Sequence, residues 1–477
     1  MHRKICLSLL LACVFFPLLG WAEGLSKSEL LPNNSSLSSL LLNKQNAQVA
    51  EAEVAFQKRE YPRAFAMYHA LATQNEPYAE YQLGYIYLNG LGTQKDFKQA
   101  RGWFEKSAEQ LPDAKFALGM MYYYGFGIAK NPGLAKELIE AAAEQHIGQA
   151  AYMLGYLYEM GLGDQPANPE KARAWYEKAA GLGIPQAQYN LGLIYYQGNG
   201  VQQDYSRALT FFLLAANQHL PKAEYMAGLM YSLGQGIEMD KSQAASWYTL
   251  AATAGIPAAE YNLGTMYYSG EGVSMNIALA TQLVNKAASA GLASAQSMLG
   301  YFAIAGIGMP ADPQLGLSWY QKAAIQGNAE AEFALGYFYY KGIGLPQDNR
   351  EAMKWFLASA KGGVANGQYM TGLFYQKGIA VPVEAQAAVY WYEQAAMQGM
   401  VNAQLMLGLM YAQGQGVKQD KKMAYAWLDL ASGSQNKALH DSAIQMRSQV
   451  GVGMTAVEMA GAKQLAQQMY QRYLGQH

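Results

Sequence analysis

The chain has 477 residues and is nearly neutral, with 34 basic against 35 acidic side chains. Only 14% of the residues are charged and 51% are hydrophobic, a composition typical of folded proteins rather than disordered ones. A net charge this close to zero provides no long-range attraction for nucleic acid or anionic lipid, so we expect neither as a partner.

The first 22 residues have the features of a signal peptide. A basic stretch at residues 2–4 precedes an apolar run at 5–19, which is too short for a comfortable transmembrane helix. Small residues then precede a predicted cleavage site after Ala22. The alternative is a lipoprotein signal at Cys13, but the apolar run continues past that cysteine. We expect a periplasmic or secreted protein without an integral membrane segment after cleavage.

Both cysteines of the chain, Cys6 and Cys13, lie inside this predicted signal. The mature protein is therefore expected to contain no thiol, and packing alone must stabilise it in an oxidising compartment. Downstream, residues 23–40 are rich in serine and asparagine and predict a flexible leader. Residues 41–78 predict a pair of helices that departs from the repeat pattern and forms an N-terminal cap.

One sequence pattern recurs ten times between residues 79 and 436. Its first copy reads Ala-Glu-Tyr-Gln-Leu-Gly-Tyr-Ile-Tyr-Leu-Asn-Gly, and successive copies start 35 to 37 residues apart. A period this regular predicts a stacked solenoid rather than separate domains. With each start counted as position 1, the ten repeats begin at Ala79, Ala114, Ala150, Ala187, Ala223, Ala259, Ala295, Ala331, Gly367 and Ala403.

Each repeat begins with a predicted helix that ends at a glycine. Apolar residues at positions 1, 5, 8 and 9, such as Ala259 and Leu263, have the helical spacing of one buried face. Position 12 is glycine in all ten repeats, and glycine just past a helix is the usual left-handed stop. Position 6 is also always glycine, although a mid-helix glycine costs roughly 1 kcal/mol against alanine. We therefore expect another helix to pass close to position 6.

A second predicted helix follows in every repeat. Position 18 is Asp or Asn in eight repeats, the third has Asn168 one place later because its loop is one residue longer, and the ninth has Glu384. Asp and Asn are N-cap residues, and each contributes roughly 1 kcal/mol. An Ala-x-x-aromatic-aromatic-x-x-Ala-Ala pattern comes next, as at Ala172 to Ala180, and its spacing is again helical.

Residues 437–477 depart from the repeat and predict a C-terminal helical cap. Residues 437–448 indicate one helix, and Thr455 with Glu458 fits a capping box that starts a final helix reaching about Tyr473. Solenoids need such ends to cover an otherwise exposed core.

The repeated motifs resemble the Sel1-like repeat family. The shared motifs are Ala-x-Tyr-x-Leu-Gly-x-x-Tyr, then Gly-x-Gly, an Asp cap and Ala-x-x-Trp-Tyr-x-x-Ala-Ala. The resemblance covers residues 79–436 and implies an all-α fold, a right-handed superhelical solenoid of about ten 36-residue helix-turn-helix repeats with helical end caps. Members of this family are typically adaptors in signalling, envelope biogenesis or interaction with host cells, so the resemblance implies a protein partner.

No arrangement of catalytic or metal-binding residues stands out. None of the histidines has a metal-type partner three or four residues away. His146 and His219 occupy a slot that is glycine in later repeats, as at Gly255, which predicts helix-end residues. The Gly-x-Gly loops lack the Lys and Ser/Thr of a P-loop. We therefore expect no enzyme activity, no cofactor and no metal.

Position 10 alternates between repeats. It accepts Glu159, Ser232 and Gln376 in odd repeats, which argues against a packed core position. We therefore expect the tyrosines of the even repeats to be exposed, on the helix that lines the concave side of tetratricopeptide-like arrays. Such a tyrosine ladder suits binding of an extended peptide or a protein edge. The alternative is half-buried packing of each tyrosine on its neighbour. The candidate partner-binding residues are Tyr123, Tyr196, Tyr268 and Tyr340.

Three functions remain open at this point. The first is an exported, monomeric adaptor that binds an envelope, secreted or host protein through its concave face. The second is a structural component of envelope polysaccharide or peptidoglycan maintenance. The third is a small-ligand binder or hydrolase, which the missing site chemistry disfavours. The sequence does not separate the first two.

Overall fold

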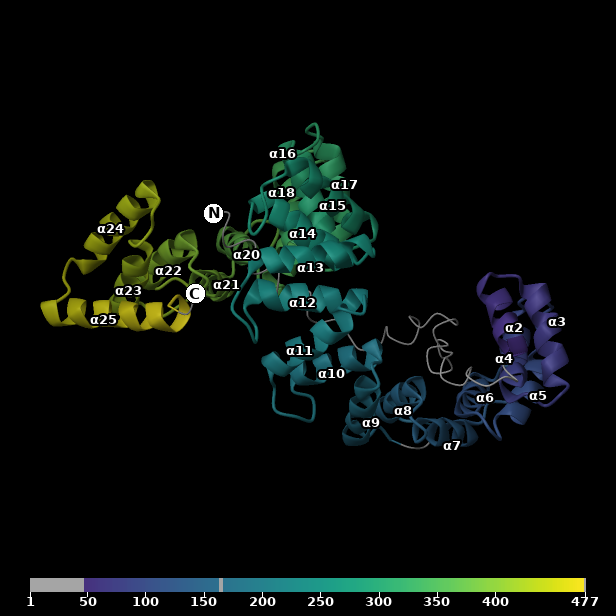
Figure 1. Cartoon of the computed structure of the whole chain (residues 1–477). Helices are drawn as coiled ribbons and strands as arrows, with labels where there is room; N and C mark the ends of the chain where they lie inside the picture. The colour runs from purple at the N-terminus through teal and green to yellow at the C-terminus, as the bar shows by residue number, and fades with distance from the viewer. Residues whose placement is uncertain (1–46, 163–165, 476–477) are drawn as a thin grey trace. The chain divides into compact units, whose positions relative to one another are not determined.

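The computed structural model describes residues 47–162 and 166–475. The predicted signal peptide with Ala22 and Cys13, and the leader at 23–40, lie outside the described residues. The chain divides after Ile256 into two compact halves, and each is described by itself (Figure 1). All regular elements in the described part of the chain are helices, which confirms the all-α prediction.

The helices of the first half follow one another with short connections. They are α2 (Ala47–Gln57), α3 (Tyr61–Ala72), α4 (Pro77–Asn89), α5 (Phe97–Ser107), α6 (Pro112–Tyr124), α7 (Pro132–Ala143), α8 (Gly148–Met160), α9 (Pro169–Gly181), α10 (Pro185–Gln197), α11 (Tyr205–Ala216), α12 (Pro221–Leu233) and α13 (Lys241–Thr253).

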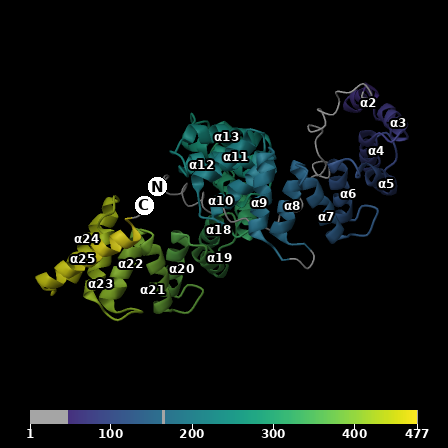
Figure 2. The same ribbon diagram turned by 60° about the horizontal axis from the view of Figure 1, so that its bottom comes forward.

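The second half continues the same alternation of first and second helices. Its helices are α14 (Pro257–Ser269), α15 (Ile277–Ser289), α16 (Ala293–Ala305), α17 (Pro313–Ile325), α18 (Ala329–Lys341), α19 (Asn349–Lys361), α20 (Ala365–Lys377), α21 (Ala385–Met397), α22 (Val401–Gln413), α23 (Lys421–Ala431), α24 (Lys437–Gly451) and α25 (Ala456–Tyr473). In each half the helical hairpins follow one another in chain order (Figure 2).

The predicted glycine stops end the first helices. Gly90 and Gly342 adopt left-handed φ angles of 73° and 68°, a conformation that glycine reaches without steric cost. Gly161 differs, with ψ at 158°, in the repeat whose loop is one residue longer. After the second helices, His146 and His219 are also left-handed, at φ 65° and 58°, which confirms that they are helix-end residues.

The predicted N-caps start the second helices. The Asp204 carboxylate accepts from the Arg207 backbone N–H, and the same bond recurs at the other Asp and Asn caps. Glu384 makes no side-chain cap bond. The backbone N–H of each cap residue also donates to a carbonyl of the preceding first helix, as from Asp204 to Tyr195 at 2.9 Å. This bond closes the long loop inside each hairpin.

The glycines at position 6 lie where the two helices of a hairpin touch. A Cβ added to Gly192 would lie 2.6 Å from ring atoms of Phe212 on the second helix. In repeat seven the backbones themselves meet, because a Cβ on Gly316 would lie 2.8 Å from the Gly300 carbonyl oxygen. The prediction of close helix–helix contact at this position is confirmed.

Further helices flank the repeats at both ends. On α2, the buried Glu53 carboxylate accepts from the hydroxyls of Tyr68 at 2.8 Å and Tyr78 at 2.7 Å, which ties α2 to α3 and α4. At the other end, α25 starts with the predicted Thr455–Glu458 capping box. Its apolar side packs on the last repeat, where Trp427 is only 2% exposed.

Candidate protein-binding surface

The structure contradicts the expectation that the position-10 tyrosines are exposed. Tyr196 is buried, and Tyr123, Tyr268 and Tyr340 are half-buried. The Tyr196 ring lies 6.4 Å from that of Phe212 on the second helix of its own hairpin, and its hydroxyl donates to Gln235 at 3.0 Å. Tyr268 and Tyr340 lie 5.0 Å and 5.5 Å from rings on the first helix of the next repeat, so position 10 takes part in packing the array, as the alternative of half-buried packing predicted.

The polar residues at position 10 have a packing explanation as well. The Tyr176 hydroxyl donates to Glu159 at 2.6 Å, and the Tyr392 hydroxyl donates to Gln376 at 2.8 Å. In these two repeats a tyrosine on the second helix is therefore matched by a hydrogen-bonding partner on the first, whereas in repeat seven Tyr320 is matched by the apolar Ile304. In the repeats that have tyrosine at position 10, the equivalent residue of the second helix has no hydroxyl. Those pairs are Tyr123 with Ile139, Tyr196 with Phe212, Tyr268 with Val284, and Tyr340 with Phe356.

Position 7 of the first helices is accessible in part of the second half, although Met120 and Leu229 are buried at the same position in the first half. Tyr301 on α16 and Tyr337 on α18 occupy position 7 of successive repeats and are 41% and 40% exposed. Position 4 lies one helical turn earlier on the same face and carries half-buried apolar residues. We call these eight residues the α16–α22 stripe. Its members are Met298, Tyr301, Ala334, Tyr337, Met370, Leu373, Met406 and Leu409.

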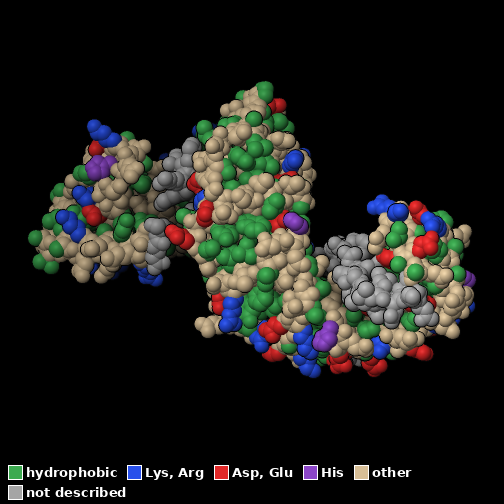
Figure 3. All heavy atoms as spheres, in the orientation of Figure 1, with side chains coloured by type: hydrophobic (Ala, Val, Ile, Leu, Met, Phe, Trp, Pro, Cys, Tyr) green, Lys and Arg blue, Asp and Glu red, His purple; other side chains and the backbone are tan. Residues whose placement is uncertain are grey.

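The stripe has few charges beside it. The Lys341 ammonium lies 5.9 Å from the Tyr337 ring, and Lys377 is the equivalent residue of the next repeat. Hydrophobic side chains also gather over the region of α14 to α16 on the face seen in Figure 3. An apolar surface with exposed aromatic rings and a sparse polar border is typical of protein interfaces. Sequence reasoning missed this column because position 7 is apolar in most repeats and reads as core.

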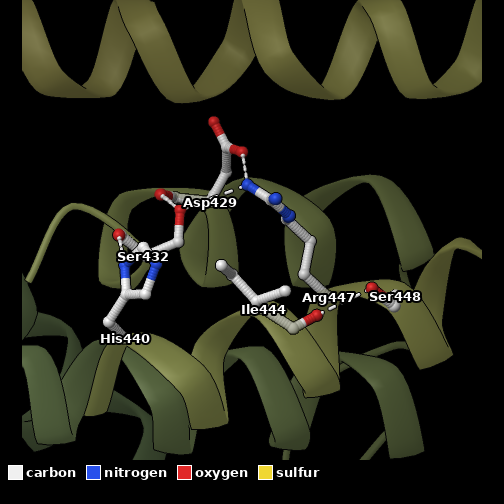
Figure 4. A network of polar contacts seen from close by, with 6 residues as sticks. All are labelled: Asp429, Ser432, His440, Ile444, Arg447 and Ser448. Atoms are coloured by element: carbon white, nitrogen blue, oxygen red, sulfur yellow. Dashed lines mark hydrogen bonds and ion pairs between the residues drawn. The ribbon is translucent and has the colours of Figure 1, made fainter. Parts of the chain in front are cut away.

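A polar network on α23 and α24 contains the residue types of a catalytic triad without its geometry (Figure 4). The His440 Nδ1 lies 2.5 Å from the Ser432 backbone carbonyl, not from the hydroxyl. That hydroxyl donates to the Asp429 backbone carbonyl at 2.6 Å and accepts from Arg447, which also pairs with the Asp429 carboxylate. No base faces the serine hydroxyl, so the network joins the C-terminal cap to the last repeat.

An open hollow of ≈ 740 Å³ lies beside the start of α23 and α25. Its polar groups serve the helix ends. Asp420 caps α23, Glu458 belongs to the capping box of α25, and the Lys421 ammonium donates to the Val452 carbonyl at 3.3 Å. These contacts give the hollow a structural role at the junction of repeat ten and the cap.

Metal-binding clusters and membrane-spanning helices are both absent from the part of the chain that the structure describes. Within residues 47–162 and 166–475, no group of three or more His, Cys, Asp or Glu side chains is placed to hold a metal ion. Over the same residues, no helix combines the length and the apolarity needed to cross a membrane.

Stacked helical hairpins with a period near 36 residues define an α-solenoid of the repeat-protein class. The chain belongs to the Sel1 repeat family. Ten Sel1 repeats match it, each starting about two residues before the starts predicted from sequence. The matched segments are 77–110, 112–146, 148–184, 185–220, 221–256, 257–292, 293–328, 329–364, 365–400 and 401–434.

Two solved structures are similar over much of the chain. One is c5321, a protective antigen of uropathogenic Escherichia coli with a Sel1-like repeat fold. It is 29% identical with a TM-score of 0.60, and the match covers 86% of this chain and 95% of that one. The other is a Sel1 repeat protein from Oxalobacter formigenes, 30% identical with a TM-score of 0.50, covering 65% and 90%.

A curated relative matches only locally. The HRD3 component of the ERAD-associated E3 ubiquitin-protein ligase of Candida glabrata is 31% identical over 64 residues, which is 13% of this chain and 8% of that protein. Sel1 repeat proteins generally act in protein–protein interaction, and this chain shares their architecture over most of its length.

Proposed function

We propose that this chain is an exported scaffold that holds a partner protein on the first-helix face of its repeats. The observation that carries the proposal is the α16–α22 stripe, in which exposed Tyr301 and Tyr337 stand on successive first helices among apolar neighbours. Burying two tyrosines and adjacent methionine and leucine side chains gives the kind of aromatic anchor on which protein interfaces rely.

The occupant that fits this surface is an extended segment of another protein with apolar side chains. Anchor positions repeat from one first helix to the next, so a chain crossing the helices meets an equivalent apolar site in each repeat. Lys341 and Lys377 border the stripe at the helix ends, which favours a segment that carries a carboxylate beside its apolar residues.

Export rests on the N-terminal pattern of a basic stretch, an apolar run and small residues before Glu23. Intact mass of the protein taken from its native compartment tests it. We expect a mature chain beginning at Glu23. A chain that still begins at Met1, or one that carries lipid on Cys13, would contradict the proposal.

Substitution of the two exposed tyrosines tests the binding surface. We expect Tyr301→Ser with Tyr337→Ser to weaken capture of the partner roughly 30- to 700-fold, since interface anchors contribute on the order of 1–2 kcal/mol each. Helical content should not change, because both rings are already exposed. The matched control is Tyr390→Ser on the second helix α21, where the ring is 53% exposed.

A photo-reactive residue at position 337 locates the contact. Crosslinks should join it to one continuous segment of the partner, and they should disappear when Tyr301 is replaced by Ser. If the double variant captures the partner as well as wild type does, or if Tyr390→Ser loses it instead, the first-helix face is not the binding surface.

A further inference from the structure

A buried glutamine clamps successive repeats together in the second half. Position 2 of the repeat is Gln296, Gln368 or Gln404, and each side chain is at most 6% exposed. In each case the amide Nε2 donates to the carbonyl of the residue eight places earlier, at the end of the preceding second helix. The distances are 3.2 Å to Ala288, 3.3 Å to Ala360 and 3.2 Å to Ala396.

The oxygen of the clamp is satisfied as well. Gln326, at the end of α17, donates to the Gln296 oxygen at 2.8 Å, and Gln398 does the same for Gln368. Both glutamines also donate to a carbonyl one repeat back, at Gly291 and Gly363. The clamps at Gln296 and Gln368 therefore combine a donor that reaches the preceding helix end with an amide that donates to the clamp's own oxygen.

Glu332 occupies this column between Gln296 and Gln368, 36 residues from each. It is 9% exposed, so it lies nearly as deep as the glutamines. Gly362 stands where Gln326 and Gln398 supply the second donor, so the carboxyl has no amide facing it from that site. The carbonyl of Ala324, eight residues earlier, is equivalent to the acceptors of the glutamine clamps.

We propose that Glu332 is a proton-dependent version of the glutamine clamp. With a proton taken up from solvent, its carboxyl donates to the Ala324 carbonyl as an amide does. Without the proton, two acceptors face each other, the Glu332 carboxylate and the Ala324 carbonyl. The contact between α17 and α18 is then more stable in mild acid than at neutral pH.

Glu332 differs from the other glutamates at position 2 in the charges around it. Burial alone raises the pKa of Glu332. Three charged residues lie on neighbouring turns: Lys322 in the last turn of α17, Lys361 in the last turn of α19, and Glu330 on α18 itself. None of them contributes to the shift in the pKa of Glu332. At the other glutamates of the column burial also raises the pKa, but a neighbouring cation opposes it. These pairs are Glu80 with Lys106, Glu224 with His219, and Glu260 with Lys286.

The sign of the effect follows from the direction of the shift. A carboxyl whose pKa is raised by folding contributes stability that is present below its unfolded pKa, near 4.3, and is lost as pH rises through the folded pKa. Glu332→Gln keeps the donor at every pH. We therefore expect Glu332→Gln to melt roughly 2–4 °C above wild type at pH 8, and this difference to shrink toward zero at pH 4.

The opposite substitution at another clamp tests the proposal even if Glu332→Gln disturbs the fold locally. Gln404→Glu places a carboxyl in the clamp of repeat ten, where Ser434 stands at the second donor position. We expect this variant to melt below wild type at pH 8 and to recover on acidification. Equal pH dependence of the melting temperature in wild type and Glu332→Gln, together with none added by Gln404→Glu, overturns the proposal.

Discussion

A single methyl group added at position 6 tests the close packing of the hairpins. The Cβ of a Gly192→Ala variant lies 2.6 Å from two ring carbons of Phe212, about 1 Å inside the usual carbon–carbon contact. The ring has no room to retreat, because Phe212 is fully buried and its centroid lies 5.6 Å from that of Tyr189 and 6.4 Å from that of Tyr196.

Two effects of opposite sign compete in this variant. Alanine in place of a mid-helix glycine stabilises by about 1 kcal/mol. Overpacking a closed core costs about 1–3 kcal/mol, and a rigid ring that cannot turn away places this site toward the upper end. We therefore expect a net loss of about 1–2 kcal/mol in the free energy of unfolding.

The chain provides a control in which only the favourable effect operates. Gly102 lies in the middle of α5, and a Cβ there meets nothing within 4 Å. We expect Gly102→Ala to gain up to about 1 kcal/mol. Equilibrium urea unfolding of the full chain, followed by circular dichroism, compares the two. If both variants are stabilised equally, the interpretation of position 6 as a steric contact is refuted.

Two further changes test the packing and the capping of the hairpins. Tyr196→Ser removes a buried ring and should cost about 3 kcal/mol, so its melting temperature should fall clearly; an unchanged melting temperature would show that the ring lies free in solution. Glu384→Asp supplies the N-cap that α21 lacks and should raise the urea midpoint by the equivalent of about 0.5–1 kcal/mol, whereas Asp204→Glu should lower it; no response at either site would contradict the capping assignment.

The sequence predicted those features that a few neighbouring residues determine. A glycine stop such as Gly90, a cap such as Asp204 and the Thr455–Glu458 box depend on the conformation of one turn. The close approach at Gly192 could be predicted too, because ten repetitions of an unfavourable residue need a common cause.

Exposure of the position-10 column could not be predicted from that column alone. Polarity at Glu159 and Gln376 is explained by a phenol on the other helix of the hairpin, 16 or 17 residues further along the chain. The signal was present in the sequence as a correlation between the two columns. The exposure of Tyr301 and Tyr337 could not be predicted either. An apolar residue at helical spacing gives the same sequence pattern whether or not a neighbouring side chain covers it.

The matching of position 10 to the second helix has a consequence for how such an array gains and loses repeats. Loss of residues 185–220, one whole hairpin, removes Tyr196 and Phe212 together and leaves every other pair intact. Loss of residues 205–240 removes 36 residues as well, but joins the first helix of repeat four to the second helix of repeat five. Tyr196 then faces Tyr248, and two phenol rings compete for the space of one. We therefore expect a deletion that cuts between hairpins to be better tolerated than one that cuts inside a hairpin, although both preserve the reading frame and the period.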